Sequence, residues 1–510
     1  MFKKHPKGLL AAALANMGER FGFYTMMAIL SLFLMSKFDL SETKAGYIYS
    51  AFYFSIYILA FVGGLIADKT ANFKKTILAG LVLMAAGYLI IAIPTPTPVP
   101  DGQYVFMLIL CCAGLFVIAF GNGLFKGNLQ ALVGQMYDDP KYAKMRDSGF
   151  SLFYMFINVG AIFAPFFAVA VRNWWVGSHG YGYDANLSEL CNRYLRGALT
   201  PDGQASFQSL AAEAGYTGAD LTAFAREYLH IFVTGFHYAF AVAIVAMMIS
   251  LVIYVINRKT FPNPSAAKQA SGLANDGGMS AREIRQRLYA LFAVFAVVIF
   301  FWFSFHQNGL TLTYFAKDFT NVSNIRLDLG FTKLIGVELF QSVNPFFVVF
   351  LTPVILAVFG ALRARGKEPS TPRKIAIGML IAASAYALMT LGSTGLPDKA
   401  DIVQAGGLTD AEKVTPFLLI GTYFILTVAE LFISPLGISF VSKVAPPRYQ
   451  GMMQGLWLCA TAVGNSLLFI GAIFYEKLSL PVTWLLFVIV CLTSMCLMLA
   501  MLKWLERVAK

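Results

Sequence analysis

The stretch Gly8–Ser36, GLLAAALANMGERFGFYTMMAILSLFLMS, decides the fold, because it is long and apolar enough to cross a bilayer core of about 30 Å. Glu19 and Arg20 stand side by side within it, and no other charge lies between Lys7 and Lys37. A buried ion is costly even when it is paired, and a charge at the middle of a membrane is costly on every scale. A membrane helix that keeps both charges is expected to use them.

Similar apolar runs recur along the whole chain of 510 residues, of which 58% are apolar and only 13% are charged. A soluble protein carries about a quarter charged residues, so a very large soluble helical core is disfavoured. The first run is too long for the apolar region of a signal peptide, and no small-residue cleavage site follows it. The composition therefore predicts an all-α membrane protein whose first helix stays in the membrane.

About twelve transmembrane helices are expected. The predicted spans are 8–36, 45–67, 75–95, 104–136, 148–172, 229–257, 287–316, 341–363, 373–393, 414–442, 449–475 and 481–503. Basic residues concentrate at both termini and in the loops after the even-numbered spans, which predicts that both termini are cytoplasmic. The basic residues behind the net charge of +12 lie where membrane orientation requires them, so no nucleic-acid partner is expected.

The polar segment between the sixth and seventh spans has the Pro, Ser, Ala and Gly content of a linker. It divides the chain into two six-helix bundles, residues 1–257 and 287–510, joined by a cytoplasmic linker at 258–286. A long extracytoplasmic loop, 173–228, separates the fifth and sixth spans. Two such bundles are the architecture of the major facilitator superfamily, whose members bind substrate near the bilayer midplane between the bundles.

Other function classes receive little support from the sequence. Five of the six cysteines lie in apolar runs, which leaves only Cys191 in a polar segment and no partner for a loop disulfide. Neither an H-E-x-x-H, a G-x-S-x-G nor a phosphate-binding loop occurs, so no enzyme, metal or cofactor is expected. A channel would favour rings of like charge rather than a mixed set.

The first span carries polar and apolar candidates on one helical face. Asn16, Glu19, Arg20, Phe23 and Met27 follow one another at intervals of one, three or four residues, and a helix brings such positions to the same side. This face is predicted to line the inside of the protein.

Further polar groups interrupt spans of both bundles. The main candidates are Lys126 between glycines, Tyr154 with Asn158 four residues on, His306, Asn344 and Glu430. Lys126 and Arg20 supply positive charge from the first bundle and Glu430 negative charge from the second, so the cavity between them would fit a zwitterion. Carboxylates and a histidine inside a membrane can also carry protons. For Asn122, Asn128 and Asn465 a bond to a neighbouring helix is the preferred interpretation.

Several segments match, in order, the motifs of one family. These segments are Asn16–Tyr24 (family pattern E-x-x-E-R-F-x-Y-Y), Gly63–Asp68 (G-x-x-A-D), Phe120–Gln135, Phe150–Gly160 (F-Y-x-x-I-N-x-G), Phe340–Pro345, Glu430–Pro435 and Gly455–Trp457. Over nearly its whole length the chain thereby resembles the proton-dependent oligopeptide transporter family (POT, also called PTR) of the major facilitator superfamily.

The resemblance implies roles for individual residues. Lys126 would receive the carboxylate of a peptide, while Asn158, Asn344 and Glu430 would hold its ammonium end. The remaining substrate contacts would come from Tyr57, eleven residues before Asp68, from Tyr154 and from Trp457, which would line a side-chain pocket. Proton coupling would involve Glu19, Arg20, His306 and Glu430.

The motif positions also depart from the family pattern. Asn16 replaces the first glutamate and Phe23 the first of two tyrosines, while Met27 and His306 replace an arginine and a glutamate that can pair across the bundles. Both partners of that pair are lost together, as the cost of a stranded buried charge requires. We therefore expect the outer gate to close without it, through His306 and Met27 or through packing alone.

The sequence thus predicts a monomeric, multi-pass protein of the bacterial inner membrane that imports di- and tripeptides by proton-coupled alternating access. Two alternatives stay open. One is the same fold moving a non-peptide anion or zwitterion, which the loss of the arginine at Met27 favours. The other is a peptide carrier with weakened proton coupling, which Asn16 and His306 favour.

Overall fold

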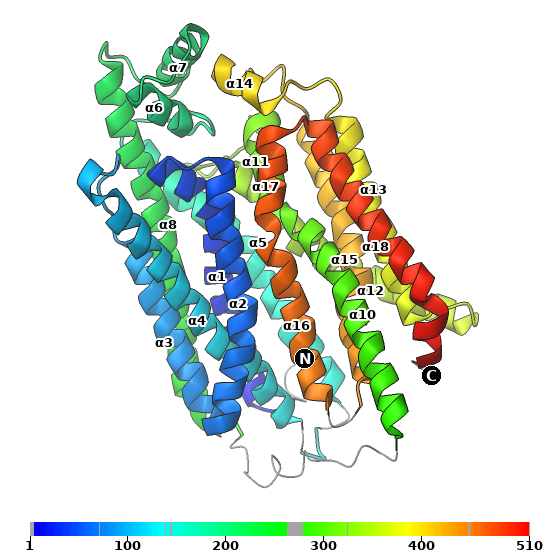
Figure 1. Cartoon of the computed structure of the whole chain (residues 1–510). Helices are drawn as coiled ribbons and strands as arrows, with labels where there is room; N and C mark the ends of the chain where they lie inside the picture. The colour runs from blue at the N-terminus through cyan, green and yellow to red at the C-terminus, as the bar shows by residue number, and fades with distance from the viewer. Residues whose placement is uncertain are drawn as a thin grey trace.

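The computed structural model describes residues 5–70, 72–137, 139–142, 145–262, 279–323, 325–446 and 449–508, and it is almost entirely helical (Figure 1). Within these residues, twelve helical segments are long and apolar enough to cross a membrane. Only helices satisfy every backbone hydrogen-bonding group within a single lipid-embedded segment, which is why apolar runs of this length fold in this way. The protein is a multi-pass membrane protein, as predicted.

The membrane helices of the first half follow the predicted spans closely. They are α1 (Gly8–Phe38), α2 (Glu42–Thr70), α3 (Phe73–Ala92), α4 (Tyr104–Met136), α5 (Arg146–Ser178) and α8 (Leu221–Asn257). Polar caps set some of the boundaries: the Asp220 side chain accepts from the backbone N–H groups of Thr222 and Ala223, which starts α8 before the predicted span 229–257.

The membrane helices of the second half are more often interrupted. They are α10 (Ala281–Phe305) with α11 (Thr311–Phe319), the 3₁₀ segment η6 (Val337–Ser342) with α12 (Val343–Ala364), α13 (Thr371–Gly392), α15 (Pro416–Val444), α16 (Gln450–Ser466) with α17 (Leu468–Lys477), and α18 (Leu480–Val508). The seventh span breaks at the 3₁₀ turn η5 (His306–Gly309), and the eleventh breaks at Leu467. Irregular backbone at this depth is tolerated where protein surrounds it.

Glycines bring α2, α3 and α4 into close contact. A Cβ at Gly121 would lie 2.7 Å from the Gly80 carbonyl oxygen of α3, and a Cβ at Gly123 would overlap the Leu59 backbone of α2. This tight packing fixes the height and rotation of α4, and with them the position of Lys126.

The helices before residue 257 pack mainly on one another, and so do those after residue 281 (Figure 1). The most extensive contacts between the groups are those of α2 with α16 and α17 and those of α5 with α12 and η6. Of the predicted linker, residues 263–278 lie outside the described residues. α10 begins at Ala281 rather than at 287, because the Ser280 side chain caps it by accepting from the Glu283 N–H.

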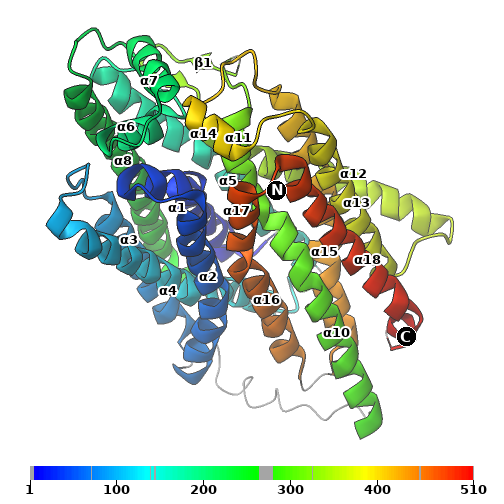
Figure 2. The same cartoon turned by 45° about the horizontal axis from the view of Figure 1, so that its top comes forward.

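The small elements gather at one end of the helices, at the top of Figure 1 and in front in Figure 2. They are α6 (Leu187–Leu195), α7 (Pro201–Glu213), α14 (Lys399–Ala405) and the hairpin of β1 (Leu327–Asp328) and β2 (Lys333–Leu334), in which Leu327 pairs with Leu334. We call this the outer end, because the loop 173–228 that is predicted to be extracytoplasmic lies there. Because α5 and α8 extend into the predicted loop 173–228, the connection between them is shorter, 179–220.

Candidate functional site

Glu19 and Arg20 form a two-bonded ion pair inside the protein. The Arg20 Nε and Nη2 atoms donate to Glu19 Oε2 and Oε1, both at 2.6 Å, and both side chains are buried. The Asn122 amide of α4 donates a third bond to Glu19 Oε1 at 2.5 Å. The neighbouring Asn16 is also buried, and its Nδ2 finds no acceptor among the described residues. The Glu19–Arg20 pair is neutral as a unit, so burying it costs less free energy than burying either charge alone.

Lys126 lies on α4 without a carboxylate partner. Its ammonium nitrogen sits 4.4 Å from the centroid of the Tyr57 ring of α2, and it makes no ion pair within the part of the chain that the structure describes. Glu19 and Arg20 act on it electrostatically and in opposite directions. The lysine is therefore held by an aromatic face that leaves its charge uncompensated.

Glu430 of α15 is the corresponding negative group of the second half. Its Oε2 accepts a hydrogen bond at 2.9 Å from the Asn344 amide of α12, which also donates to the Thr427 hydroxyl at 2.9 Å. Among the described residues Glu430 has no cationic partner. Asn344 therefore orients the carboxylate without neutralising it.

Tyrosines connect the two unpaired charges. The Glu430 carboxyl acts electrostatically on the hydroxyls of Tyr24, Tyr57 and Tyr154, and Tyr57 is the ring on which Lys126 rests. Tyr154 exposes 50% of its surface, whereas Asn158, one turn on, is buried and donates to the Tyr154 carbonyl at 3.2 Å. The structure thus brings together most of the residues that the sequence predicted. We name Lys126, Tyr57, Tyr154, Asn344 and Glu430 the midplane cluster.

His306 lies beside this cluster, at the break in the seventh span. Its Nδ1 is 2.6 Å from Asn465 Oδ1, and its ring lies between Trp302 (centroids 5.0 Å apart) and Tyr53 (4.9 Å). Tyr53 in turn contacts Tyr57, at 5.8 Å between ring centroids. The preferred interpretation of Asn465, a bond to a neighbouring helix, is confirmed, and its partner is the candidate proton carrier.

Trp457 is packed inside the second helix group. It is only 3% exposed and packs against Phe295, with ring centroids 6.1 Å apart, and against Gly437, where any side chain would overlap the indole. Its predicted role in lining a side-chain pocket stays a prediction.

Sequence reasoning missed Tyr24, Tyr53 and Thr427 as members of this neighbourhood. A signal was present for Tyr53, because Tyr49, Tyr53 and Tyr57 repeat every four residues and so share one face of α2. Tyr24 stands within the first-helix motif itself.

The outer end is closed by buried charges from both helix groups. Arg172 at the end of α5 pairs with Glu338 of η6, and both side chains are fully buried. The adjacent Asn173 amide donates to the carbonyl oxygens of Lys333 and Ile335, each at 2.8 Å.

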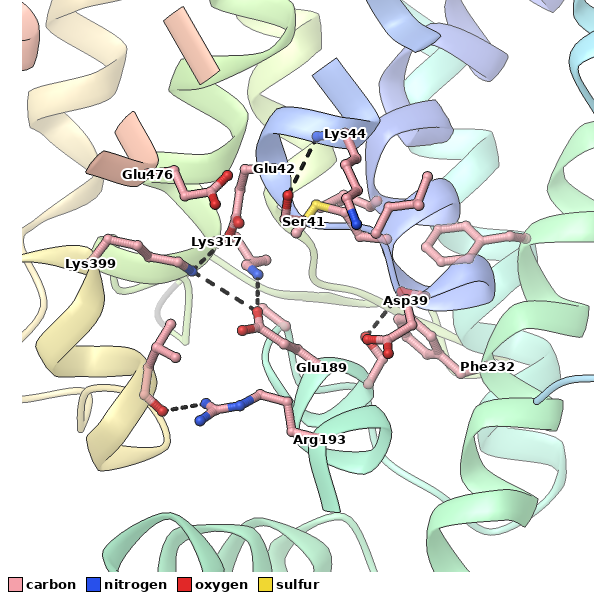
Figure 3. A pocket seen from close by; sticks show the side chains of 18 of the residues that line it. Asp39, Ser41, Glu42, Lys44, Glu189, Arg193, Phe232, Lys317, Lys399 and Glu476 are labelled. Carbon is pink, nitrogen blue, oxygen red and sulfur yellow. Dashed lines mark hydrogen bonds and ion pairs between the residues drawn. The ribbon is translucent and has the colours of Figure 1, made fainter. Parts of the chain in front are cut away.

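A second set of ion pairs borders a cavity of about 380 Å³ at this end (Figure 3). Lys317 pairs with Glu189 at 2.5 Å, and Lys399 pairs with Glu42 at 2.9 Å and with Asp318 at 2.7 Å. Burial alone would raise the pKa of Glu189, but Lys317 and Lys399 outweigh it and hold that pKa well below the usual range. Burial would likewise lower the pKa of Lys399, but Asp318, Glu189 and Glu42 raise it.

The prediction that His306 with Met27, or packing alone, closes the outer gate is therefore wrong. Met27 lies in the apolar core, and ion pairs between the helix groups close the outer end instead. The residues of these ion pairs lie at the ends of the predicted spans or outside them. In every ion pair between the two helix groups, the two partners are more than a hundred residues apart in the sequence. Span prediction could not match them.

The model of the POT family matches residues 74–272 and 278–481. Peptide transporter YePEPT of Yersinia enterocolitica subsp. palearctica serotype O:3 (strain YE-P4) is 31% identical over 486 residues, covering 91% of this chain and 87% of that protein. Dipeptide and tripeptide permease A of Salmonella typhimurium (strain LT2) is 26% identical over 468 residues, covering 91% and 83%.

Solved structures share the fold. That of peptide transporter POT in complex with sulfate superposes with a TM-score of 0.71 at 24% identity, over 100% of this chain and 96% of that one. That of a POT family transporter in complex with 5-aminolevulinic acid also gives 0.71, at 22% identity, over 100% and 98%. The family model covers most of the chain, and the Yersinia relative matches nearly all of it. The chain belongs to the POT family.

Proposed function

We propose that this protein imports di- and tripeptides by proton-coupled alternating access. One observation carries the proposal: Lys126 and Glu430 are opposite charges without ion-pair partners among the described residues, they belong to different helix groups, and both act on Tyr57. Unpaired charge inside a membrane protein is costly, so a ligand that supplies both missing partners gains from both. A peptide with free termini is such a ligand.

We assign one end of the peptide to each helix group. The carboxylate would bind the Lys126 ammonium, and the peptide ammonium would bind Glu430, which Asn344 already orients. Tyr154 and Asn158 would contact the backbone between them. Hydrogen bonds to charged groups contribute about 1.5–3 kcal/mol each, which is enough to discriminate against peptides with a blocked end. The relatives named above as peptide transporter and dipeptide and tripeptide permease support this substrate class.

Alternating access would separate the outer contacts and form others at the opposite end. The moving bodies would be the bundles 1–257 and 287–510, joined by the linker 258–286, and the outer ion pairs would break and re-form in each cycle. Both termini would lie on the cytoplasmic side of the bacterial inner membrane, and the transporter would work as a monomer in the bilayer. We assign it no catalytic activity, cofactor or nucleic-acid partner.

Glu19 and Glu430 accept different hydrogen bonds, which suggests that the two carboxylates have different roles in proton coupling. Glu19 accepts from three donors, two of them from Arg20, which stabilise its ionised form. Glu430 accepts from one neutral amide within the described residues, so it is the carboxylate that can take a proton when no peptide ammonium is bound. Protonation of Glu430 would in turn affect the Glu19–Arg20 pair. His306 would be coupled to the midplane cluster through Tyr53, which contacts both His306 and Tyr57.

The test is uptake of a labelled dipeptide into liposomes that contain the purified protein, with and without an inward proton gradient. We expect uptake that unlabelled dipeptide inhibits and that the gradient stimulates. If no dipeptide competes, the peptide proposal is wrong; if the gradient has no effect, proton coupling is wrong. 5-Aminolevulinic acid, a zwitterion without a peptide bond, serves as a comparison competitor, and stronger inhibition by it than by any dipeptide would point to a non-peptide substrate.

A further inference from the structure

Two loops of the outer end contact each other across the boundary between the helix groups. One is the segment of α6 and α7, between α5 and α8. The other is α14, between α13 and α15 (Figures 1 and 2). We use the name outer latch for the contacts of 399–406 with 187–213 and with Glu42, together with the neighbouring Lys317–Glu189 ion pair.

The carboxyl end of α14 receives hydrogen bonds from the other helix group. The last carbonyl oxygens of a helix have no partner within it. Here the Arg193 guanidinium of α6 donates to the Val403 carbonyl, and the Thr200 hydroxyl at the start of α7 donates to the Gln404 carbonyl at 2.5 Å. A cation at this end also complements the helix dipole. Residues of the first half thus cap a helix of the second half.

Gly406, which directly follows α14, is fitted closely to α7. Its φ of +81° is a conformation that favours glycine, and a Cβ there would lie 2.8 Å from Ser206 Cβ and 3.0 Å from Gly203 Cα. The Ser206 hydroxyl donates to the Gly406 carbonyl at 3.3 Å. The contact therefore depends on the absence of a side chain at 406.

The amino end of α14 carries the charged part of the latch. Lys399, the first residue of α14, pairs with Glu42 at the start of α2 at 2.9 Å, and it is only 5% exposed (Figure 3). Lys317 of α11 reaches Glu189 of α6 beside it, at 2.5 Å. Both ends of α14 are thus bound to the first helix group.

We propose that the outer latch is a releasable lock, which holds the outer mouth shut and must separate at both ends of α14 before substrate enters from outside. The proposal rests on the proposed alternating access, and it adds a gate that lies in the loops, outside the membrane helices. Because the two ends of α14 belong to one short helix, opening breaks the hydrogen bonds to its last carbonyl groups and the ion pairs at its amino end in one step. Weakening either end should favour the open form.

The first test locks the latch with a cleavable cross-link. Thr200→Cys with Gln404→Cys puts thiols on two residues that a hydrogen bond joins across the boundary, and a short bifunctional maleimide with a disulfide in its spacer can connect them. Gly406 is left unchanged, because a Cβ there would lie 2.8 Å from Ser206 Cβ, closer than a direct disulfide tolerates. We expect the cross-linker to abolish dipeptide uptake and a reductant to restore it, while each single variant is insensitive to both. Full uptake by the cross-linked protein would overturn the proposal.

The second test needs no peptide, so it separates failure of the latch from failure of the proposed function. Leu32→Cys places a thiol on the buried lining of the outer cavity, and its reaction rate with a membrane-impermeant maleimide reports opening. Adding Gly406→Ala should raise that rate about fivefold, the effect of losing roughly one hydrogen bond. Gly395→Ala is the matched control, because Gly395 has a similar φ of +85° but no neighbour within 4 Å. Equal rates in the two variants would contradict the latch.

Discussion

The Lys126 ammonium lies 4.4 Å from the centroid of the Tyr57 ring, and within the described residues no carboxylate pairs with it. A cation over an aromatic face gains about 0.5–2 kcal/mol, less than a buried ion loses on desolvation. The lysine therefore stays poised for an anionic ligand.

Lys126→Ala should weaken dipeptide binding about 10- to 100-fold, because it removes a charged hydrogen bond worth about 1.5–3 kcal/mol. The measurement is competition against labelled dipeptide uptake. A dipeptide with an amidated carboxyl end should bind wild type and variant equally, because it never uses the lysine. Tyr57→Phe keeps the ring that holds the lysine but removes a hydroxyl predicted to contact substrate, so it should weaken binding by less than Lys126→Ala. An amidated peptide as sensitive to Lys126→Ala as the free one would contradict the assignment.

Glu430→Gln should cause a similar loss for the peptide ammonium, and it should also reduce stimulation by a proton gradient. Asn344→Ala should weaken binding by less, about 3- to 10-fold, because the carboxylate remains but loses its 2.9 Å hydrogen bond. N-acetylated dipeptides distinguish the role of Glu430 in binding from its role in proton coupling. They lack the ammonium group, so they should bind wild type and Glu430→Gln about equally. Unchanged gradient stimulation in Glu430→Gln would remove this residue from proton coupling.

Glu19→Gln should destabilise the protein by about 3 kcal/mol or more, because it strands the buried Arg20 guanidinium. The double change Glu19→Gln with Arg20→Met should recover part of the loss. Asn122→Ala, which removes only the third donor to the carboxylate, is expected to cost about 1–3 kcal/mol. Thermal unfolding in detergent measures all three, and a double variant less stable than Glu19→Gln would show that the pair is not the stabilising unit.

His306→Ala should reduce the difference between uptake with and without a proton gradient. The imidazole is bonded to Asn465 and lies between Trp302 and Tyr53, so removing it breaks the route from the second helix group to Tyr57. Counterflow, which needs no gradient, is the comparison and should be affected less. Uptake with an intact pH dependence in His306→Ala would exclude the histidine from coupling.

The outer latch should be insensitive to pH over the range in which transporters use proton gradients. The lysines that face Glu189 hold its pKa below the ordinary 4.5, so its contribution is complete above about pH 4.5 and is lost only as the pH falls further. Lys399 stays charged as well, because its pKa is raised. Labelling of Leu32→Cys should thus be equal at about pH 5.5 and 7.5, after correction for the maleimide reaction itself. Faster labelling on acidification would assign a titrating role to the latch.

The sequence by itself determined the membrane architecture. Hydropathy is a local property, so runs such as Gly8–Ser36 fix where helices cross the membrane, and all twelve predicted spans appear in the structure. Helical periodicity also placed Glu19 and Arg20 on an inward face. The motif residues Lys126, Asn344 and Glu430 could be selected in the same way, because a polar group within an apolar run is visible without coordinates.

Only the tertiary structure decided which charges meet. Glu42 and Lys399 stand 357 residues apart, yet they lie 2.9 Å from each other; Glu19 finds its third donor, Asn122, on α4. The break at His306 and the capping of α14 by Arg193 were equally invisible. Hydropathy and periodicity report what each segment buries, but an ion pair or a capped carbonyl depends on how distant segments pack. That packing supplied the outer closure, which the sequence had assigned to other residues.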